Sequence, residues 1–348
     1  MTSAVRSKPL RVGFLALADA APFAVAQARG LFVRHGLAVE LRREVGWATI
    51  REKIIGGELD AAQSPAPMLC ATRLGLDSAA CPVLTGLVLN LHGNAITLSE
   101  RLWDEGVRDG ASLREAARRR RGEQRLTLGV VFPFSSHHLL LRSWLRAAGL
   151  DPDRDVRLVV VPPAQMFRNL VAGTIEGYCV GEPWTSLAVR EREGWCPAWS
   201  AALHPGHVEK VLMVTERFAE RRPAEHAALI AALAEACAWC DQPENRGELA
   251  ELMAGAAYVN QPARVLRASL GGRFDCGHGR IEDAPDFHVF HRGDANMPTE
   301  AKAAELQQEL RAAGVLGSAP LPPELPGRLF REDLFHAACP GLCPCPAP

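Results

Sequence analysis

The apolar residues of this chain fall into short runs that alternate with segments of helical period. Leu10–Leu17 is mostly apolar, as a buried parallel strand should be. Pro22–Gly30 has the period of a helix and ends at a glycine. Ala38–Arg43 alternates apolar and polar residues, which indicates a strand near a sheet edge. A helix, a strand and a helix are expected next, at Thr49–Gly56, Asp60–Gln63 and Pro67–Gly75. This β-α-β-α-β order predicts a parallel sheet with right-handed crossovers.

The same rhythm restarts in the middle of the chain. Arg125–Phe132 predicts a strand, and Ser136–Gly149 predicts a long helix with one apolar face. Expected strands at Arg157–Val161 and Thr174–Val180 and expected helices at Pro163–Ala172 and Thr185–Arg192 complete this unit. Before it lie two expected strands and a helix, at Cys81–Leu91, Ile96–Ser99 and Ser112–Arg121, the helix with Ser112 as its candidate N-cap.

The chain then returns to its first unit. Lys210–Thr215 predicts the returning strand, and further helices are expected at Ala224–Asp241, Glu248–Tyr258, Pro262–Leu270 and Thr299–Ala313. We therefore predict an α/β protein of two lobes with a ligand cleft between them. The first lobe is discontinuous and consists of residues 1–98 and 205–335, and the second consists of residues 99–204. Residues 336–348 form a tail rich in proline and cysteine that is expected to be flexible.

Composition excludes several classes of function. The 348 residues are enough for two domains, and 48% hydrophobic and 23% charged residues are ordinary for a globular protein. A net charge of −1 gives no general attraction to nucleic acid or to anionic membranes. No apolar run approaches the roughly 18 residues of a membrane span. Asp19 and Pro22 interrupt the first apolar stretch, which argues against a secretory signal, so a cytoplasmic protein is expected. A start upstream of Met1 stays open.

Cysteine and arginine clusters have ordinary structural explanations. Cys237 and Cys240 form a CxxC pair inside a helical pattern, which favours structure over redox or metal chemistry. A frayed terminus explains the cysteines of the tail (Cys339, Cys343, Cys345) better than a metal site does. Arg118–Arg121 is best explained as the solvated, cationic end of a helix, because no aromatic residues are interleaved with it.

Two segments resemble strand ends that carry polar groups just before a helix. One runs from Gly46–Lys53 on to Leu59–Met68, and the other is Gly177–Trp184. In α/β sheets, ligands bind in the crevice at such carboxyl ends. Two of them in separate halves of the chain indicate a cleft between lobes.

The residues that could meet in this cleft suit a small anion. They are Trp47, Gln63, His137, Gly181 with Glu182, and Lys210. Together they supply an aromatic wall, an amide donor, a switchable imidazole and a point cation. Helix N-termini at Ser136 and Pro183 add backbone N–H groups. Each residue alone has an ordinary structural explanation, so the prediction depends on the whole set and its order.

These motifs resemble a known family. The matching stretches are Trp47-x-x-x-Arg51, Asp60-Ala61-Ala62-Gln63-x-Pro65-x-Pro67-Met68, Phe132-Pro133-x-Ser135-x-His137, Gly149-x-Asp151-Pro152 and Gly177-x-Cys179-x-Gly181-Glu182-Pro183-Trp184. They are similar to the nitrate/bicarbonate-type solute-binding proteins of ABC importers, over residues 10 to 270. The resemblance implies the two-lobe, type II periplasmic-binding-protein fold, in which a ligand closes the lobes about a hinge, and it implies a protein that is not an enzyme.

The resemblance also implies a set of site residues. Oxyanion contacts fall by motif on Trp47, Gln63, His137, Gly181 and Lys210, with Lys210 the loosest match. Glu182 is expected to orient His137 or Lys210 rather than to touch the anion. Members that bind bicarbonate often recruit calcium, but no acidic cluster for it is evident here, so no metal and no cofactor are expected.

The absence of a signal or lipid anchor favours one branch of this family. That branch resembles the cytoplasmic nitrate/nitrite sensor, which holds an RNA-binding antiterminator partner inactive until the anion binds. The expected partners are therefore nitrate, with nitrite as a further ligand, and an antiterminator-type protein, without direct contact to nucleic acid or membrane. The first alternative is an importer's binding subunit for nitrate or bicarbonate.

The second alternative is an enzyme of pyrimidine-precursor or quinone synthesis on the same fold. It is disfavoured because the sequence shows no carboxylate pair, no Ser–His–Asp order and no Schiff-base lysine context. The choice among nitrate, nitrite and bicarbonate stays open.

Overall fold

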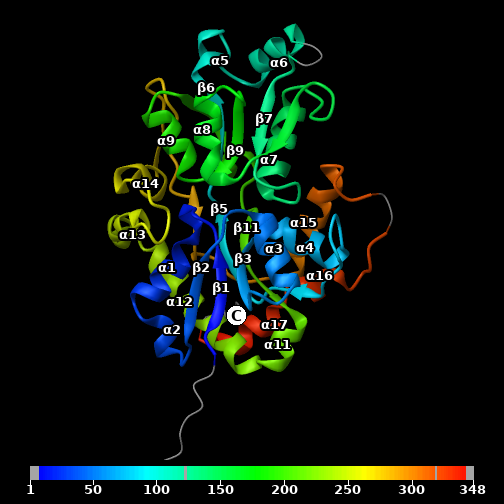
Figure 1. The fold of residues 1–348 in the computed structure, drawn as a ribbon, viewed down its shortest axis with the longest axis vertical. Coiled ribbons are helices and arrows are strands. Elements are labelled where there is room, and N and C mark those ends of the chain that lie inside the picture. The colour runs from blue at the N-terminus through cyan, green and yellow to red at the C-terminus, as the bar shows by residue number, and fades with distance from the viewer. Residues whose placement is uncertain (1–7, 121–123, 318–319, 342–348) are drawn as a thin grey trace, which may run out of the picture.

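The computed structural model describes residues 8–120, 124–317 and 320–341, and these residues build two sheets with helices on both faces. Figure 1 shows the two sheets one above the other, with β5 and β11 running up to the junction. The mixed α/β architecture is the one predicted. No helix within these residues combines the length and the apolar composition needed to cross a membrane.

The first sheet contains seven strands in the order β14-β5-β11-β3-β1-β2, with β4 paired to β11. Their bounds are β1 Leu10–Phe14, β2 Val39–Arg43, β3 Ala61–Pro65, β4 Val83–Leu84, β5 Val88–His92, β11 Val208–Thr215 and β14 His288–Val289. β1 is parallel to β2 and β3, as the β-α-β rhythm predicts, whereas β11 returns antiparallel to β3 and β5. The returning strand therefore lies in the middle of the sheet, where its residues are buried.

The second sheet contains five strands in the order β10-β6-β9-β7-β8. Their bounds are β6 Asn94–Ser99, β7 Thr127–Val130, β8 Arg157–Val160, β9 Gly177–Gly181 and β10 Gly194–Trp199. Because β6 already pairs with β9, the chain leaves the first lobe at Gly93, earlier than the expected boundary at residue 99. A separate hairpin joins β12 (Arg273–Asp275) to β13 (Ile281–Asp283).

Helices cover both faces of each sheet. In the first lobe they are α1 Ala21–Ala28, α2 Leu31–Arg34, α3 Trp47–Ile55, α4 Ala66–Leu74, α11 Glu216–Arg221, α12 Pro223–Asp241, α13 Arg246–Ala254, α14 Ala263–Leu270, α15 Glu300–Ala312, α16 Leu325–Leu329 and α17 Glu332–Ala338. In the second lobe they are α5 Glu100–Asp104, α6 Gly110–Arg119, α7 Ser136–Ala147, α8 Met166–Val171, α9 Trp184–Arg190 and α10 Ser200–Leu203.

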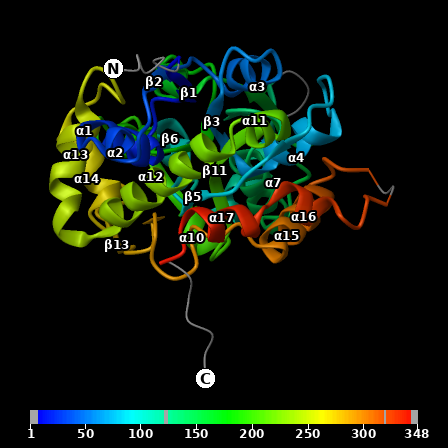
Figure 2. The ribbon, with the colours of Figure 1, turned by 90° about the horizontal axis from the view of Figure 1, so that it is seen from below.

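The first sheet is buried on both sides because its strands alternate between two apolar clusters. Leu212 and Val214 of β11 pack with α1 and α12, while Val211 and Met213 pack with α3 and α4. Figure 2 shows these two helix layers from below, with α1, α12 and α13 on one side and α3 and α4 on the other. The second lobe has its own core around α6 and α7.

Several local expectations were wrong for identifiable reasons. The expected strand at Cys81–Leu91 is interrupted, because Thr85 Oγ1 forms hydrogen bonds with the N–H and the carbonyl of Leu87 at 3.1 and 2.8 Å. The N-cap of α6 is Asp109, and Ser112 is the third helical residue of its capping box. β10 was not predicted, because Pro197 lies at a bulge between Trp195 and Ala198.

The described part of the expected tail, residues 336–341, begins within a helix. α17 extends to Ala338, and Cys339 is buried against the cluster around α12. Cys343 and Cys345 lie outside the described residues, as does Arg121 of the arginine run. Arg118 pairs with Glu115 and Arg120 with Glu105, which fits the solvated helix end predicted for that run.

Candidate functional site

The centre of the candidate site is the ammonium group of Lys210, on β11, which is wholly buried. Lys210 Nζ lies 2.8 Å from Asp19 Oδ2 and also forms an ion pair with Glu209 Oε1. The same nitrogen lies 5.3 Å from the centre of the Trp47 ring, so the indole forms one wall of the site. A buried charge without a partner would be costly, and the two carboxylates provide the compensation.

Gln63 is held rigidly by two hydrogen bonds. Its Nε2 donates to Asp19 Oδ1 at 2.7 Å, and its Oε1 accepts from the backbone N–H of Leu15 at 3.2 Å. Asp19 lies in the short 3-10 helix Ala18–Ala20 that follows β1. Because β1 and β3 are neighbours in the sheet, their ends bring Asp19 and Gln63 together.

His137 is the contribution of the second lobe, in the first turn of α7. Ser135 caps this helix, with its Oγ accepting from the backbone N–H of His138 at 3.3 Å. His137 Nε2 lies 3.7 Å from Glu209 Oε1, and neither ring nitrogen has a hydrogen-bond partner among the described residues. Burial lowers the pKa of His137 to about 3, so the ring is neutral near pH 7 and can donate one hydrogen bond.

Glu209 is the residue on which both lobes converge. Asn94 Nδ2 donates to Glu209 Oε2 at 2.5 Å, and His207 Nε2 lies 3.2 Å from the same oxygen. Burial acts to raise the pKa of Glu209, but Lys210 and then His137 outweigh burial and hold the pKa well below its usual value. Glu209 is therefore ionised across the physiological range.

The charge balance of this centre differs from the expected one. Burial raises the pKa of Asp19 even though Lys210 opposes the shift. Burial would lower the pKa of Lys210, but Asp19 and Glu209 raise it above the usual value. The carboxyl groups of Asp19 and Glu209 both contact the Lys210 ammonium, while His137 is neutral near pH 7. The sequence predicted Lys210 as a point cation and showed no acidic cluster for calcium. The topology adds two carboxyl groups, and both of them contact Lys210.

Gly181 and Glu182 reach the same region from β9. A Cβ at Gly181 would lie 3.4 Å from Asn94 Oδ1 and 3.5 Å from Asp19 Oδ2, so the backbone there closely approaches the centre. Glu182 does not take the orienting role that the resemblance implied. Its Oε2 accepts from the Ser186 N–H at 3.2 Å, and burial raises its pKa to about 7. In the described residues, Glu209 rather than Glu182 contacts His137 and Lys210.

The five residues expected to bind the ligand therefore lie around one buried centre. Several polar atoms there have no hydrogen-bond partner in the described part of the chain: Trp47 Nε1, both ring nitrogens of His137, and Asn94 Oδ1. Buried polar atoms in folded proteins nearly always have a partner. Unpaired donors on both lobes around one point indicate a place for a small polar guest.

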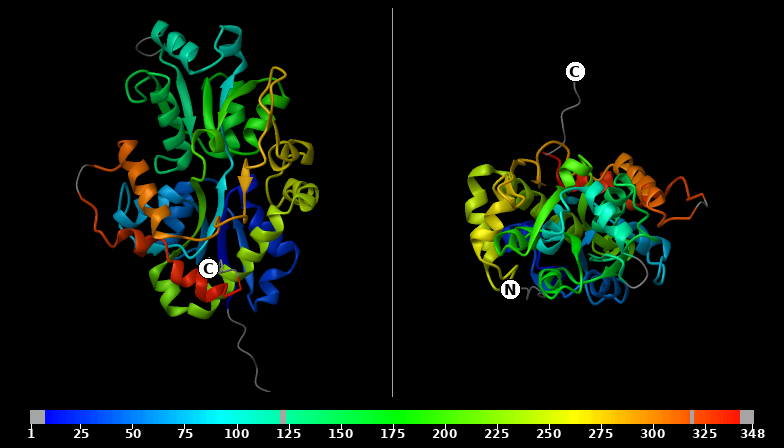
Figure 3. Two further views of the ribbon diagram at one scale, coloured as in Figure 1. Left: turned by 180° about the vertical axis from the view of Figure 1, so that it is seen from behind. Right: turned by 90° about the horizontal axis from the view of Figure 1, so that it is seen from above.

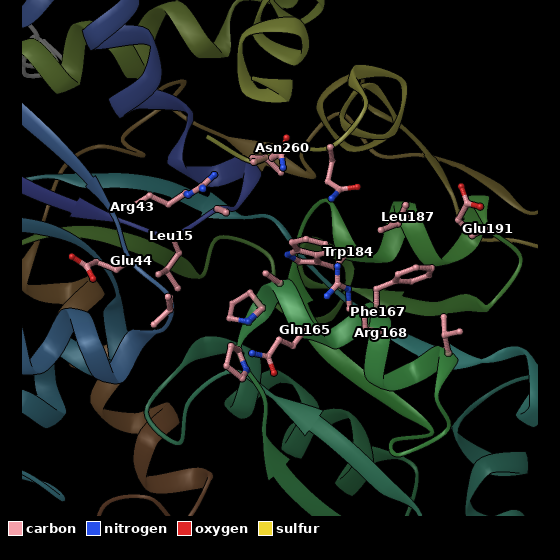
Figure 4. Close-up of a pocket in the computed structure, with 18 of the residues that line it drawn as sticks. Leu15, Arg43, Glu44, Gln165, Phe167, Arg168, Trp184, Leu187, Glu191 and Asn260 are labelled. Atoms are coloured by element: carbon pink, nitrogen blue, oxygen red, sulfur yellow. The ribbon is translucent and has the colours of Figure 1, made fainter. Parts of the chain in front are cut away.

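A cleft lies between the lobes, and none of the residues of the buried centre lines it. Its volume is about 770 Å³, and Figure 4 shows side chains of both lobes around it, including Leu15 and Glu44 on one side and Phe167 and Trp184 on the other. Leu15 lines the cleft, and its backbone N–H is the one that holds Gln63. Leu15 therefore connects the wall of the cleft to Gln63.

Sequence reasoning missed Asp19, Asn94, His207 and Glu209. In the sequence, Asp19 was treated only as an interruption of an apolar run. A lone acidic residue at the end of a buried strand is itself an indication of a buried polar site. Glu209, the neighbour of Lys210, was not singled out. The carboxylates of Asp19 and Glu209 offer oxygen ligands of the kind hard cations take, but Lys210 engages both.

Comparison with known proteins agrees with this architecture. The chain matches the NMT1-like family over residues 3–254. It is 44% identical over 334 residues to the bicarbonate transport ATP-binding protein CmpC of Synechocystis sp. (strain ATCC 27184 / PCC 6803 / Kazusa). This alignment covers 94% of this chain and 49% of CmpC. It is 32% identical over 344 residues to the nitrate/nitrite binding protein NrtA of Nostoc sp. (strain PCC 7120 / SAG 25.82 / UTEX 2576). This alignment covers 96% of this chain and 77% of NrtA.

A solved structure matches nearly the whole chain. The periplasmic nitrate-binding protein NrtA from Synechocystis PCC 6803 aligns with a TM-score of 0.90 and 27% identity, covering 98% of this chain and 90% of that one. This match confirms the periplasmic-binding-protein fold and the resemblance to nitrate- and bicarbonate-type binding proteins. The chain spans about half the length of the first curated relatives that it matches, which are ATP-binding proteins of nitrate and bicarbonate transport.

Proposed function

This chain belongs to the NMT1-like family, and on that premise we propose that it binds a small planar oxyanion, nitrate or bicarbonate, between its two lobes. The observation that carries the proposal is the buried ammonium of Lys210, surrounded by unpaired donors from both lobes. A flat monovalent anion fits a stacking wall at Trp47 and needs only a few donors. The names of the related NrtA and CmpC proteins support the same class of ligand.

The anion must compete with two carboxylates for Lys210. In our proposal it takes the place of Asp19 at the ammonium, and Asp19 takes up a proton because its burial already raises its pKa. Gln63, Trp47 and neutral His137 then donate hydrogen bonds to the oxyanion, and charge-assisted bonds of this kind contribute about 1.5–3 kcal/mol each. Nitrate affinity should consequently fall as pH rises, because the proton becomes harder to supply.

Bicarbonate is the second candidate, and the carboxylates favour it. Nitrate can only accept hydrogen bonds, whereas bicarbonate carries an O–H that can donate to Asp19 or Glu209. A site with two carboxylates next to one ammonium therefore suits an anion that brings its own proton. The 44% identity with a protein named for bicarbonate transport agrees with this assignment.

Calorimetric titration with nitrate, nitrite, bicarbonate and chloride tests the proposal. One equivalent of nitrate or bicarbonate should bind, and nitrate should bind with proton uptake, visible as a heat that depends on the ionisation enthalpy of the buffer. Chloride serves as a spherical control anion. Absence of saturable binding by all the planar anions would overturn the proposal, and a preference for bicarbonate over nitrate would select the second candidate.

We further propose that the bound anion is a signal inside the cell rather than a cargo, and that the chain catalyses no reaction. The first curated relatives are named as ATP-binding proteins, and ATP is a cytoplasmic compound. A phosphate-binding loop needs Gly-Lys, and the four lysines here follow Ser7, Glu52, Glu209 and Ala301. No such Gly-Lys pair occurs in this sequence. The names of these relatives support a cytoplasmic regulatory role over an importer's external subunit.

The partner in this proposal is an RNA-binding antiterminator, released when the anion binds. Ligand control of this kind requires that the anion favour one lobe arrangement, and a shift from 1:99 to 99:1 needs about 5.5 kcal/mol. Sedimentation of purified chain with the antiterminator protein of its host should show a complex that dissociates on adding nitrate or bicarbonate. A lack of any complex with or without anion would favour the importer alternative.

A further inference from the structure

A second cluster of ligating side chains lies away from the buried centre, where the second lobe returns to the first. It consists of His204, at the end of α10, and of Glu305 and Glu309, one turn apart on α15. His204 Nε2 lies 3.2 Å from Glu305 Oε1, and His204 Nδ1 lies 3.0 Å from Glu309 Oε1. One ligand atom from each residue can be chosen so that all three lie within 4.8 Å of one another.

The cluster joins parts of the molecule that belong to different lobes. His204 follows β10 of the second sheet, whereas α15 packs on α4 and α16 of the first lobe. Two arginines of α7 fasten the same end of α15: Arg142 Nε donates to the Ala313 carbonyl at 3.0 Å, and Arg146 Nη1 donates to the Ala312 carbonyl at 2.7 Å. Figure 3 shows α15, in orange, beside the helices of the second lobe when the molecule is seen from behind.

A cavity of about 360 Å³ adjoins the cluster. His204, His207, Glu309, Arg146 and Ser136 contribute to its lining. Ser136 is 3% exposed, and its Oγ has no hydrogen-bond partner among the described residues. A buried hydroxyl without a partner on a cavity wall indicates that water or a ligand occupies the cavity. The cluster therefore has, next to it, room for the water molecules that complete a coordination shell.

We propose that His204, Glu305 and Glu309 bind a divalent metal ion of the zinc class and that this ion links the two lobes. One imidazole and two carboxylates are ligands that such ions accept, with metal–ligand distances of about 2.0–2.2 Å. The present spacing is slightly wide for these distances, but the side chain of Glu305 is 55% exposed and free to turn inward. Two carboxylates and a neutral imidazole also balance a charge of +2.

The two carboxylates contact different ring nitrogens of His204, Glu305 at Nε2 and Glu309 at Nδ1. Because one ion takes only one of these nitrogens, metal binding requires one carboxylate to turn toward the other. The charged groups on the other sides are Arg146, which is tied to the carbonyls of α15, and His207, whose Nε2 faces Glu209.

Titration of the full-length protein with Zn²⁺, and with Co²⁺ as a spectroscopic probe, tests the proposal. The wild-type chain should bind one equivalent and give the visible absorption of a cobalt complex with nitrogen and oxygen ligands. His204→Ala and Glu309→Gln should each lower metal affinity by about 10-fold or more. His35→Ala is the matched control, because His35 pairs with a single carboxylate of Glu235, and it should leave the affinity unchanged.

The zinc titrations can support or overturn the proposed metal site. Retention of full zinc affinity by a folded His204→Ala variant would overturn the proposal, as would the absence of zinc binding by the wild-type chain. A circular-dichroism melt of each variant establishes that it is folded. Because His204 is outside the anion centre, nitrate or bicarbonate binding by His204→Ala should persist, so failure of the metal site and failure of the anion site are distinguishable.

Discussion

The residue that decides the chemistry of the buried centre is Lys210. Its side chain has no exposed surface, and its two carboxylate partners come from the end of β1 and from the neighbouring position on β11. Loss of one member of a buried ion cluster leaves the others uncompensated and costs about 3–5 kcal/mol. The same ammonium supplies positive charge to the centre, whereas His137 is neutral near pH 7 because burial lowers its pKa to about 3.

Lys210→Met should therefore lower both affinity and stability. We expect nitrate or bicarbonate affinity to fall at least about tenfold, because a charge-assisted bond is lost, and the free energy of unfolding to fall by about 3–5 kcal/mol. Calorimetry and urea denaturation measure the two effects. Lys53→Met is the control, since Lys53 forms a partly exposed pair with Glu44 and should cost about 1 kcal/mol or less. Unchanged anion affinity in Lys210→Met would remove this lysine from the site.

Asp19→Asn should act in the opposite direction on nitrate. The substitution removes one of the two negative charges that face the anion while leaving an amide that can donate to it. We expect nitrate affinity to rise about tenfold near pH 8 and to lose its dependence on pH, because no proton need be taken up. Titrations at pH 6 and pH 8 measure this. An unaltered pH slope would show that another group supplies the proton.

Glu182 gives a pH effect on stability that is separate from anion binding. Burial raises its pKa from 4.5 to about 7, so the folded state binds more protons than the unfolded state between these values. Stability contributed by the protonated form is present below pH 4.5 and is lost as pH rises through about 7. Glu182→Gln should thus stabilise the protein by about 1–3 kcal/mol at pH 8 and little at pH 5. Equal effects at both pH values, in urea denaturation, would contradict this assignment.

At the scale of elements, the position of His137 depends on how α7 begins. Ser135 Oγ accepts from the N–H of His138 and donates to the Phe132 carbonyl at 2.7 Å, which fixes the entry of the chain into the helix. Ser135→Ala should cost about 1 kcal/mol of stability and also weaken anion binding several-fold, because His137 loses its fixed orientation. Thr215→Ala, the matched cap removal at α11, should cost similar stability and leave anion affinity unchanged. Equal anion affinities in Ser135→Ala and Thr215→Ala would show that the Ser135 cap does not influence anion binding.

The elements were more predictable than the contacts they create. Buried strands such as β1 and β9 follow from uniform apolar runs, and the two-unit rhythm follows from their alternation with helices. β10 could not be recognised because it contains Pro197 at a bulge. The motifs named Trp47, Gln63, His137 and Lys210 as candidates, and the structure places these residues around one buried centre. The partnership of Asp19 with Lys210 needs the knowledge that β11 returns beside β3, and no local pattern carries that information.

At the scale of the whole molecule, the burial of the centre sets how a ligand can enter. Lys210, Gln63 and His137 are all 0% exposed, and they come from both lobes, so an anion cannot reach them while the lobes stay as they are. Entry requires that the lobes separate along the cleft lined by Leu15 and Trp184 and then close again. Domain motions of this kind take microseconds to milliseconds, far longer than the diffusion of a small ion.

Opening should therefore limit the rate of binding. In stopped-flow experiments that follow tryptophan fluorescence, the observed rate should level off as nitrate or bicarbonate concentration rises, at the rate of lobe opening. Trp47 lies against Lys210 and is the expected reporter, so Trp47→Phe should lose most of the signal. The ion linking His204 to α15 would act on the same motion, and added Zn²⁺ should lower the plateau rate in the wild-type chain but not in His204→Ala. A rate that climbs linearly toward the diffusion limit would mean that the anion reaches Lys210 without separation of the lobes.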